Sequence, residues 1–238
     1  KIQTSPGSLS IGPATIHDSH PQGILTVAQV IQKSSNVGAS KIALTLDKQF
    51  MWNVYNELGL GHLEGVGFPG EATGRVRPYK TWRPIEMATM SFGHGISLTL
   101  LQLARLYTVF ANEGELRPVS LIKLNETPIG QQVFSATTAN HVKDMLELVV
   151  QPGGTAVKAQ VLGYRVAGKT GTAHKLGAHG YEENKYVASF VGMAPASNPR
   201  FIIAVMIDEP NNGAYYGGTV AAPVFSTIMA DTLRLFAV

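Results

Sequence analysis

Apolar and polar positions follow one pattern in the first part of this chain and another in the last part. In the first part, apolar residues recur three and four positions apart, the period of an amphipathic helix. We expect helices over five segments: Leu25–Lys33, a run from about Val37, Asp47–Leu58, Thr99–Asn112 and Thr138–Val150. The segment from Thr99 is the clearest, because Thr99 and Gln102 form a capping box and Gly114 follows its end.

The last part of the chain carries runs of strand length instead. Apolar runs over Tyr164–Lys169, Tyr186–Met193 and Phe201–Asp208 are separated by turn-rich loops, so we expect three strands. Pro223 lies where a last helix would open, and this helix is expected to reach about Phe236. Helices, then a three-strand meander and a packing helix, predict an α+β fold with an antiparallel sheet and flanking helices.

The remaining segments are interpreted from their turn residues. Lys1–Gly23 is rich in Pro, Gly, Ser and Thr and predicts loop with a short strand, while Gly59–Pro84 predicts mostly loop. Val119–Leu124 has a strand-like pattern. No linker-like stretch divides the chain, so residues 1–238 are expected to form one domain.

Composition and charge limit the classes of function. The chain has 238 residues, of which 45% are hydrophobic and 15% charged, and this suits a folded domain with a sizeable core. Its formal charge of +3 comes from interleaved acids and bases, so nucleic acid is not an expected partner. The chain has no cysteine, which excludes disulfides, thiolate metal sites and thiol nucleophiles.

No segment resembles a membrane span or a signal peptide. The longest strong apolar run, Phe201–Ile207, has seven residues, which suits a buried strand. The chain begins at Lys1 rather than at a methionine, so we interpret it as a fragment or a processed piece of a longer protein.

The string Lys169-Thr170-Gly171-Thr172 is the first of two motifs that carry chemistry, and it ends the strand predicted from Tyr164. An acyl-transfer site needs a nucleophile, a proton relay, a cation and an oxyanion hole. Lys169 would supply the cation, and the hydroxyls of Thr170 and Thr172 can hydrogen-bond a carboxylate. The Thr172 N–H can serve as an oxyanion donor, and Gly171 lets a substrate backbone lie against the strand.

The second motif, Ser34-Ser35-Asn36, lies between two predicted helices. Ser34 offers a hydroxyl that can pass a proton to a leaving group, and Asn36 offers an amide that can hold a substrate carbonyl and a lysine. Taken alone, these residues are most simply helix caps, and a lysine at a strand edge is commonplace. Each motif occurs once, in the required order and context, so the pair favours an active site.

The two motifs match the second and third signatures of the penicillin-recognising serine enzymes, whose first is S-x-x-K. The chain resembles the C-terminal part of the transpeptidase domain of a class B penicillin-binding protein of the division (septal) type, over essentially all 238 residues. S-S-N with K-T-G-T favours the septal over the elongation type. The further stretches that carry the resemblance are Lys33–Ser40 (KSSNVGAS), Ser91–Gly95 (SFGHG), Thr99–Gly114, Pro152–Thr155 (PGGT) and Tyr215–Phe225 (YYGGTVAAPVF).

This resemblance implies the penicillin-binding and serine β-lactamase-like fold, and an enzyme that cross-links peptidoglycan. A serine attacks the D-Ala-D-Ala end of a stem peptide, D-Ala leaves, and an amine of a second stem peptide takes the acyl group, while β-lactams trap the acyl-enzyme. Ser34, Asn36 and Lys169 are implied catalytic residues, with no cofactor and no metal. Divisome proteins are implied partners, and an inner-membrane anchor is implied to hold the catalytic domain in the periplasm.

The S-x-x-K signature is missing from its expected place. In the family it precedes S-x-N, and only 33 residues precede Ser34. The one S-x-x-K string, Ser120-Leu121-Ile122-Lys123, falls between the two motifs in a strand-like segment, where residues three apart point to opposite faces. We therefore expect the nucleophile to lie in a missing N-terminal part of the protein, and this chain alone to be inactive.

Tyr215 and Tyr216 precede a Gly-Gly turn. They either pack on their own loop or, by the resemblance, form an aromatic wall beside the active site that binds substrate and β-lactams.

Several other side chains are weaker candidates. His17 and His20 have spacing compatible with a metal pair, but without an evident third ligand a loop surface is favoured. His174, Lys175 and His179 follow K-T-G-T in a Gly-rich loop, where we expect them to be solvated, with contact to an anionic substrate as the alternative.

Two other classes of function stay open. One is a β-lactamase or D,D-carboxypeptidase, although S-S-N in place of S-D-N and the Gly- and Pro-rich stretch Gly59–Pro84 argue against a β-lactamase. The other is a non-catalytic module with the penicillin-binding fold, either a β-lactam sensor or a scaffold for divisome proteins. The upstream sequence separates them, because an S-x-x-K makes an enzyme or sensor and its absence makes a scaffold.

Overall fold

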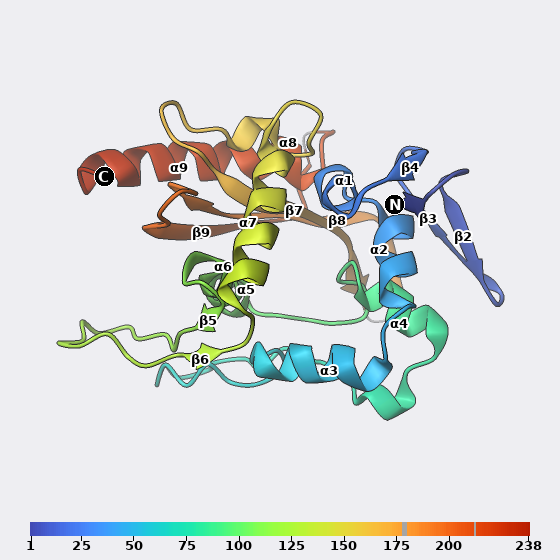
Figure 1. The fold of residues 1–238 in the computed structure, drawn as a ribbon, viewed down its shortest axis with the longest axis horizontal. Coiled ribbons are helices and arrows are strands. Elements are labelled where there is room, and N and C mark those ends of the chain that lie inside the picture. The colour runs from blue at the N-terminus through green and yellow to red at the C-terminus, as the bar shows by residue number, and fades with distance from the viewer. Residues whose placement is uncertain (178–179, 212) are drawn as a thin grey trace.

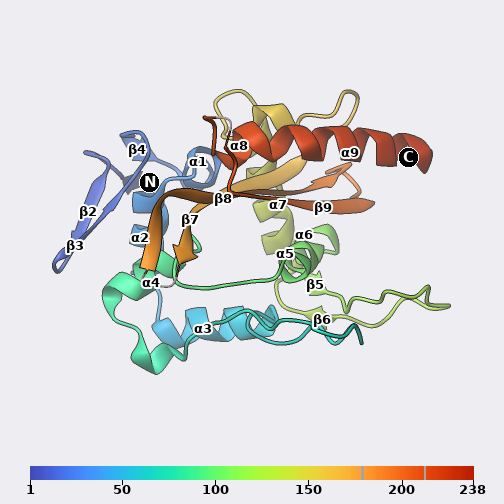
Figure 2. The same cartoon turned by 180° about the vertical axis from the view of Figure 1, so that it is seen from behind.

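A three-stranded antiparallel sheet stands at the centre of the molecule, with helices on both of its faces (Figures 1 and 2). The computed structural model describes residues 1–177, 180–211 and 213–238. The strands are β7 (Ala167–Gly177), β8 (Gly180–Ala194) and β9 (Phe201–Asp208), hydrogen-bonded in that order. The predicted α+β arrangement is confirmed, and β9 has the predicted bounds.

Successive residues of β8 point to opposite faces of this sheet, as the two-residue period of a strand requires. Phe190 is buried on one face, where its ring centroid lies 4.7 Å from that of Phe225 on α9 (Ala222–Leu235). Val191 is buried on the other face, in a cluster with Tyr107. The core therefore consists of two apolar layers, and the sheet that carries K-T-G-T is fixed between them.

β7 differs from the predicted strand at both ends. It begins at Ala167 instead of Tyr164, and it continues to Gly177 rather than ending at Lys169. It pairs with β8 along this length, with a register shift just after His174. The residues after K-T-G-T are mostly polar or small, and main-chain hydrogen bonds, which need no apolar side chain, extend the strand. K-T-G-T therefore lies inside an edge strand.

The helices around the sheet match most of the predicted segments. In chain order they are α1 (Val27–Lys33), α2 (Asn36–Ala43), α3 (Lys48–Glu57), α4 (Pro84–Met90), α5 (Leu100–Leu106), α6 (Thr108–Ala111), α7 (Ala136–Val150), α8 (Gly217–Val220) and α9, with 3-10 turns at Tyr79–Thr81 and Val157–Ala159. Within the described ranges, no helix has both the length and the apolar character needed to cross a bilayer.

The predicted helix Thr99–Asn112 is divided into α5 and α6. At the break, the Thr108 hydroxyl donates to the Arg105 carbonyl at 2.6 Å, so a side chain competes with the backbone for this acceptor. The last helix, α9, lies close to its predicted bounds, with Pro223 in its first turn.

The N-terminal segment has more strand than the sequence predicts. Two short antiparallel pairs form here: β1 (Ile2–Gln3) with β4 (Ile24–Leu25), and β2 (Ser8–Ile11) with β3 (Ala14–His17). Asp18 follows β3, and its carboxylate accepts hydrogen bonds from Ser35 Oγ at 2.7 Å and from the Val37 N–H at 2.9 Å. These bonds tie the N-terminal hairpins to the junction of α1 and α2.

The strand predicted over Val119–Leu124 does not form, and that prediction is wrong. β5 (Glu115–Leu116) and β6 (Gln131–Gln132) pair briefly, and the arm between them, residues 117–130, extends away from the body of the molecule (Figure 1). Pro118 has no N–H to donate to a ladder, and no strand within the described residues pairs with the arm. The strand-like pattern is left without a partner.

Candidate active site

Ser34 lies at the C-terminal end of α1, in the sharp turn to α2. Its φ of 55° is left-handed, a conformation that serine adopts infrequently. Ser35 is the N-cap of α2, where its Oγ accepts from the Gly38 N–H at 2.9 Å and donates to Asp18. Helix ends on both sides therefore hold the backbone at Ser34, and this turn sets the direction of its side chain.

Lys169 and Ser34, 135 positions apart in the chain, are in direct contact. Lys169 Nζ donates to Ser34 Oγ at 2.7 Å, and to the carbonyl and hydroxyl oxygens of Thr170 at 3.2 and 3.4 Å. All three acceptors are uncharged, so they do not offset the desolvation of the ammonium group. Burial therefore lowers the pKa of Lys169 to about 8, which makes it a group that can give up and regain a proton near neutral pH.

Asn36 lies in the first turn of α2, next to this contact in sequence but turned to another partner. Its Nδ2 donates to the His17 carbonyl at 3.0 Å. Among the described residues, no hydrogen bond joins Asn36 to Lys169 or to Ser34. The structure thus brings Ser34 to Lys169 and leaves the Asn36 amide bonded to the end of β3.

Thr170 and Thr172 are anchored by elements on the far side of β7. The Gly217 N–H, at the start of α8, donates to Thr172 Oγ1 at 3.0 Å, which leaves the proton of that hydroxyl free to donate. Thr170 Oγ1 lies 2.9 Å from Thr155 Oγ1. A Cβ on Gly171 would come within 2.5 Å of Ser189 Oγ on β8, so packing inside the sheet also requires a glycine here.

Thr155 and Lys33 belong to this region and were missed by sequence reasoning. Lys33 Nζ donates to the Gly153 carbonyl at 2.8 Å, so the P-G-G-T loop joins the end of α1 to Thr170. The only signal in the sequence was the resemblance carried by P-G-G-T and by K-S-S-N. No spacing rule points from a threonine in a glycine loop to a strand further along the chain.

Tyr215 and Tyr216 take part in a row of aromatic rings beside Thr172. The ring centroids of Tyr215 and Tyr186 lie 4.0 Å apart, those of Tyr215 and Tyr216 4.5 Å, and those of Tyr186 and His174 4.7 Å. The hydrogen bond that Tyr216 receives from Tyr215 raises the pKa of Tyr216. The pair packs on its own neighbours and, because Tyr216 is half exposed, also presents a ring to ligand.

Three weaker candidates find other surroundings. Lys175 forms ion pairs with Asp208 at 2.8 Å and with Glu209 at 2.7 Å, so its charge is balanced within the protein and these hydrogen bonds raise its pKa. His17 and His20 are exposed, and no three potential metal ligands converge in the part of the chain that the structure describes. His179 lies outside the described residues.

Ser120 is exposed on the arm, where its hydroxyl donates to the Ile122 carbonyl at 2.7 Å. The segment is neither a helix, which would place Lys123 beside it, nor the predicted strand. The S-x-x-K string on the arm thus makes a local turn.

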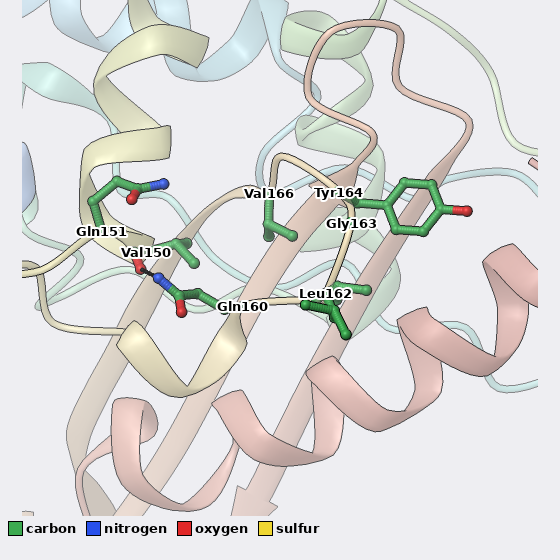
Figure 3. A pocket seen from close by; sticks show the side chains of 8 residues that line it. Val150, Gln151, Gln160, Leu162, Gly163, Tyr164 and Val166 are labelled. Atoms are coloured by element: carbon green, nitrogen blue, oxygen red, sulfur yellow. Dashed lines mark hydrogen bonds between the residues drawn. The ribbon is translucent and has the colours of Figure 1, made fainter.

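The largest cavity lies outside this region (Figure 3). It has a volume of about 400 Å³ and opens between the end of α7 and the loop before β7. Its lining residues are Val150, Gln151, Gln160, Val161, Leu162, Gly163, Tyr164 and Val166. None of these described residues is an acid, a lysine or a histidine, so the cavity offers no acyl-transfer chemistry.

Comparison with known proteins agrees with this arrangement. Residues 1–230 match the family described as penicillin binding protein transpeptidase domain. A probable peptidoglycan D,D-transpeptidase PenA of Neisseria flavescens is 48% identical over 96% of this chain and 57% of its own length. Peptidoglycan D,D-transpeptidase FtsI of Escherichia coli K12 is 46% identical over 88% of this chain and 36% of its own length. The chain thus spans about half or less of these curated relatives.

A solved structure shows the same fold. The apo transpeptidase domain of penicillin-binding protein 3 from Burkholderia pseudomallei superposes with a TM-score of 0.95, at 54% identity, over all of this chain and 72% of that chain. The expected fold class is confirmed. The chain belongs to the transpeptidase-domain family of penicillin-binding proteins, and its relatives place it in class B.

Proposed function

We propose that the full protein is a serine-type peptidoglycan D,D-transpeptidase, inhibited by β-lactams, and that this chain supplies all of its acyl-transfer site except the nucleophile. The observation that carries this proposal is the 2.7 Å contact between Lys169 Nζ and Ser34 Oγ, inside a chain of the transpeptidase family. It joins the two motifs through a proton-bearing pair.

In the proposed reaction, a serine of an S-x-x-K segment outside this chain attacks the D-Ala-D-Ala carbonyl of a stem peptide. The serine proton passes to the departing amine of D-Ala, and the acyl-serine then reacts with an amine of a second stem peptide. Ser34 is the relay for the leaving group, because a hydroxyl can accept one proton while donating its own. Lys169, with its pKa near 8, supplies positive charge and can exchange a proton with Ser34.

Substrate binding is assigned to β7 and to the aromatic residues beside it. The hydroxyls of Thr170 and Thr172 donate to the substrate carboxylate, Gly171 lets the peptide lie along the strand edge, and the Thr172 N–H is one oxyanion donor. Tyr215 and Tyr216 form an apolar wall for substrate or β-lactam. Asn36 holds a substrate carbonyl, a role that requires its amide to leave the His17 carbonyl when ligand binds.

We further propose septal cell-wall synthesis as the setting of this reaction. The support is the S-S-N with K-T-G-T combination and the 46% identity to FtsI of E. coli. An inner-membrane anchor, a catalytic domain in the periplasm and divisome partners belong to this proposal.

Labelling of the full-length protein with a fluorescent penicillin tests the function. We expect covalent label that is lost slowly, together with a cross-linked product when a stem peptide and an acceptor amine are supplied. Rapid loss of label would instead indicate a β-lactamase or carboxypeptidase. Stable label without any cross-linked product would indicate a sensor, and no label at all would indicate a scaffold.

A further inference from the structure

The loop Pro152–Thr155 touches both halves of the candidate site. On one side, Lys33 at the end of α1 donates to the Gly153 carbonyl at 2.8 Å. On the other side, Thr155 Oγ1 lies 2.9 Å from Thr170 Oγ1 on β7. One short piece of backbone therefore connects the S-S-N turn to the K-T-G-T strand.

Backbone contacts hold this loop in place. The Ala156 N–H donates to the Val149 carbonyl at 2.9 Å, which ties the loop to the end of α7. A Cβ on Gly218 would overlap the carbonyl oxygen of Thr155, so α8 lies directly against the loop. The Thr155 side chain is exposed, yet it is presented from a backbone that two helices fix.

The donors and acceptors around Thr170 give the Thr155 hydroxyl a direction. A threonine hydroxyl has two lone pairs and one proton. Lys169 Nζ can only donate, and it approaches Thr170 Oγ1 at 3.4 Å. If Thr155 donates to the second lone pair, Thr170 accepts twice and must give its own proton to a further group. In the free site that group is solvent, and in the occupied site it is a ligand.

We propose that Thr155 is a positioning residue: its hydroxyl donates to Thr170 and thereby directs the Thr170 proton to the carboxylate of a bound stem peptide or penicillin. This inference rests on the proposed function, because it concerns the same site. Thr155 touches no reacting atom in this account, and its whole effect passes through Thr170.

The test uses the full-length protein and two acylating probes, benzylpenicillin and its methyl ester, which lacks the carboxylate. Thr155→Val keeps the shape of the side chain and removes its hydroxyl. We expect acylation by benzylpenicillin to fall about tenfold in this variant, as expected for weakening one charge-assisted hydrogen bond, and acylation by the ester to change less than about twofold. Thr155→Ser keeps a hydroxyl and should return the benzylpenicillin rate to within about threefold of the wild type.

Thr138→Val is the matched control. Thr138 Oγ1 also lies 2.9 Å from another exposed hydroxyl, that of Ser135, but at the opposite end of α7. Its acylation rates should equal those of the wild type. Equal rates for Thr155→Val and wild type, or an equal loss with both probes, would overturn the inference. Failure of the proposed function is distinguishable, because the wild type itself would then not be acylated.

Discussion

The carboxylate of Asp18 accepts a hydrogen bond from Ser35 Oγ at 2.7 Å, and Ser35 is only 4% exposed. The same carboxylate accepts from the Val37 N–H, so it holds the turn from which Ser34 reaches Lys169. We expect Asp18→Ala to lower the free energy of unfolding by about 2–3 kcal/mol, because two hydrogen bonds to a charged acceptor are lost and a buried hydroxyl loses its partner. Urea denaturation measures this change.

Asp231→Ala is the control for that variant. Asp231 pairs with Arg234 at 3.0 Å, but both side chains are largely exposed, at 63% and 82%. Solvent screening limits such a pair to less than about 1 kcal/mol. An equal loss of stability in Asp18→Ala and Asp231→Ala would show that the Asp18 contacts do not hold the turn.

Lys169 should make the stability of the protein depend on pH in the alkaline range. Burial lowers its pKa from 10.5 to about 8, so between these pH values the unfolded state binds more protons than the folded state. The free energy of unfolding contributed by this residue therefore rises as pH increases from 8 to 10.5. Lys169→Met cannot be charged, and urea unfolding at several pH values should show that this rise is missing from the variant. The same rise in both proteins would contradict the assignment.

Glu86 should contribute stability that acid removes. Hydrogen bonds from the side chain and backbone of Arg83 hold the pKa of Glu86 at about 2, below its ordinary 4.5. Its contribution is complete above pH 4.5 and is lost as pH falls through about 2. Glu86→Gln keeps the cap without the charge, so the stability difference from wild type should shrink between pH 5 and pH 2. A difference that stays constant over this range would argue against the lowered pKa.

Arg105 and Glu64 form an ion pair at 2.8 Å, with the Glu64 side chain only 2% exposed. Removal of the arginine leaves a carboxylate buried without a counter-charge. We expect Arg105→Met to lower the free energy of unfolding by about 3–5 kcal/mol, and the double variant with Glu64→Gln to recover part of this loss. Purely additive losses in denaturant unfolding would mean that the two groups are not coupled.

The sheet could be predicted where side chains decide it. Phe190 and Val191 fill opposite apolar layers, so β8 has a clear pattern, and the apolar run of β9 gives its bounds. The extension of β7 to Gly177 could not be seen, because it is held by main-chain bonds between polar and small residues. Val119–Leu124 shows the reverse error: it has the side chains of a strand, but no strand among the described residues pairs with it.

The candidate site was predictable where the motifs are specific. S-S-N and K-T-G-T together pointed to a contact between Ser34 and Lys169 that no local pattern contains. The ties that hold this contact, from Asp18 and Thr155, were not predictable, because an acid after a short strand and a threonine after two glycines are ordinary loop residues. Their partners lie far along the chain, and only the folded structure brings them together.

The central claim is that Lys169 and Ser34 act as one proton-bearing pair, and penicillin acylation of the full-length protein tests it most directly. The measurement is the second-order rate constant of acylation for the wild type, Ser34→Ala, Lys169→Ala and the double variant. We predict that each single variant falls by about a hundredfold or more, and that the double variant is little worse than the slower single variant, because the pair acts as a unit. Wild-type rates in either single variant would contradict the claim, and so would losses in the double variant that simply multiply.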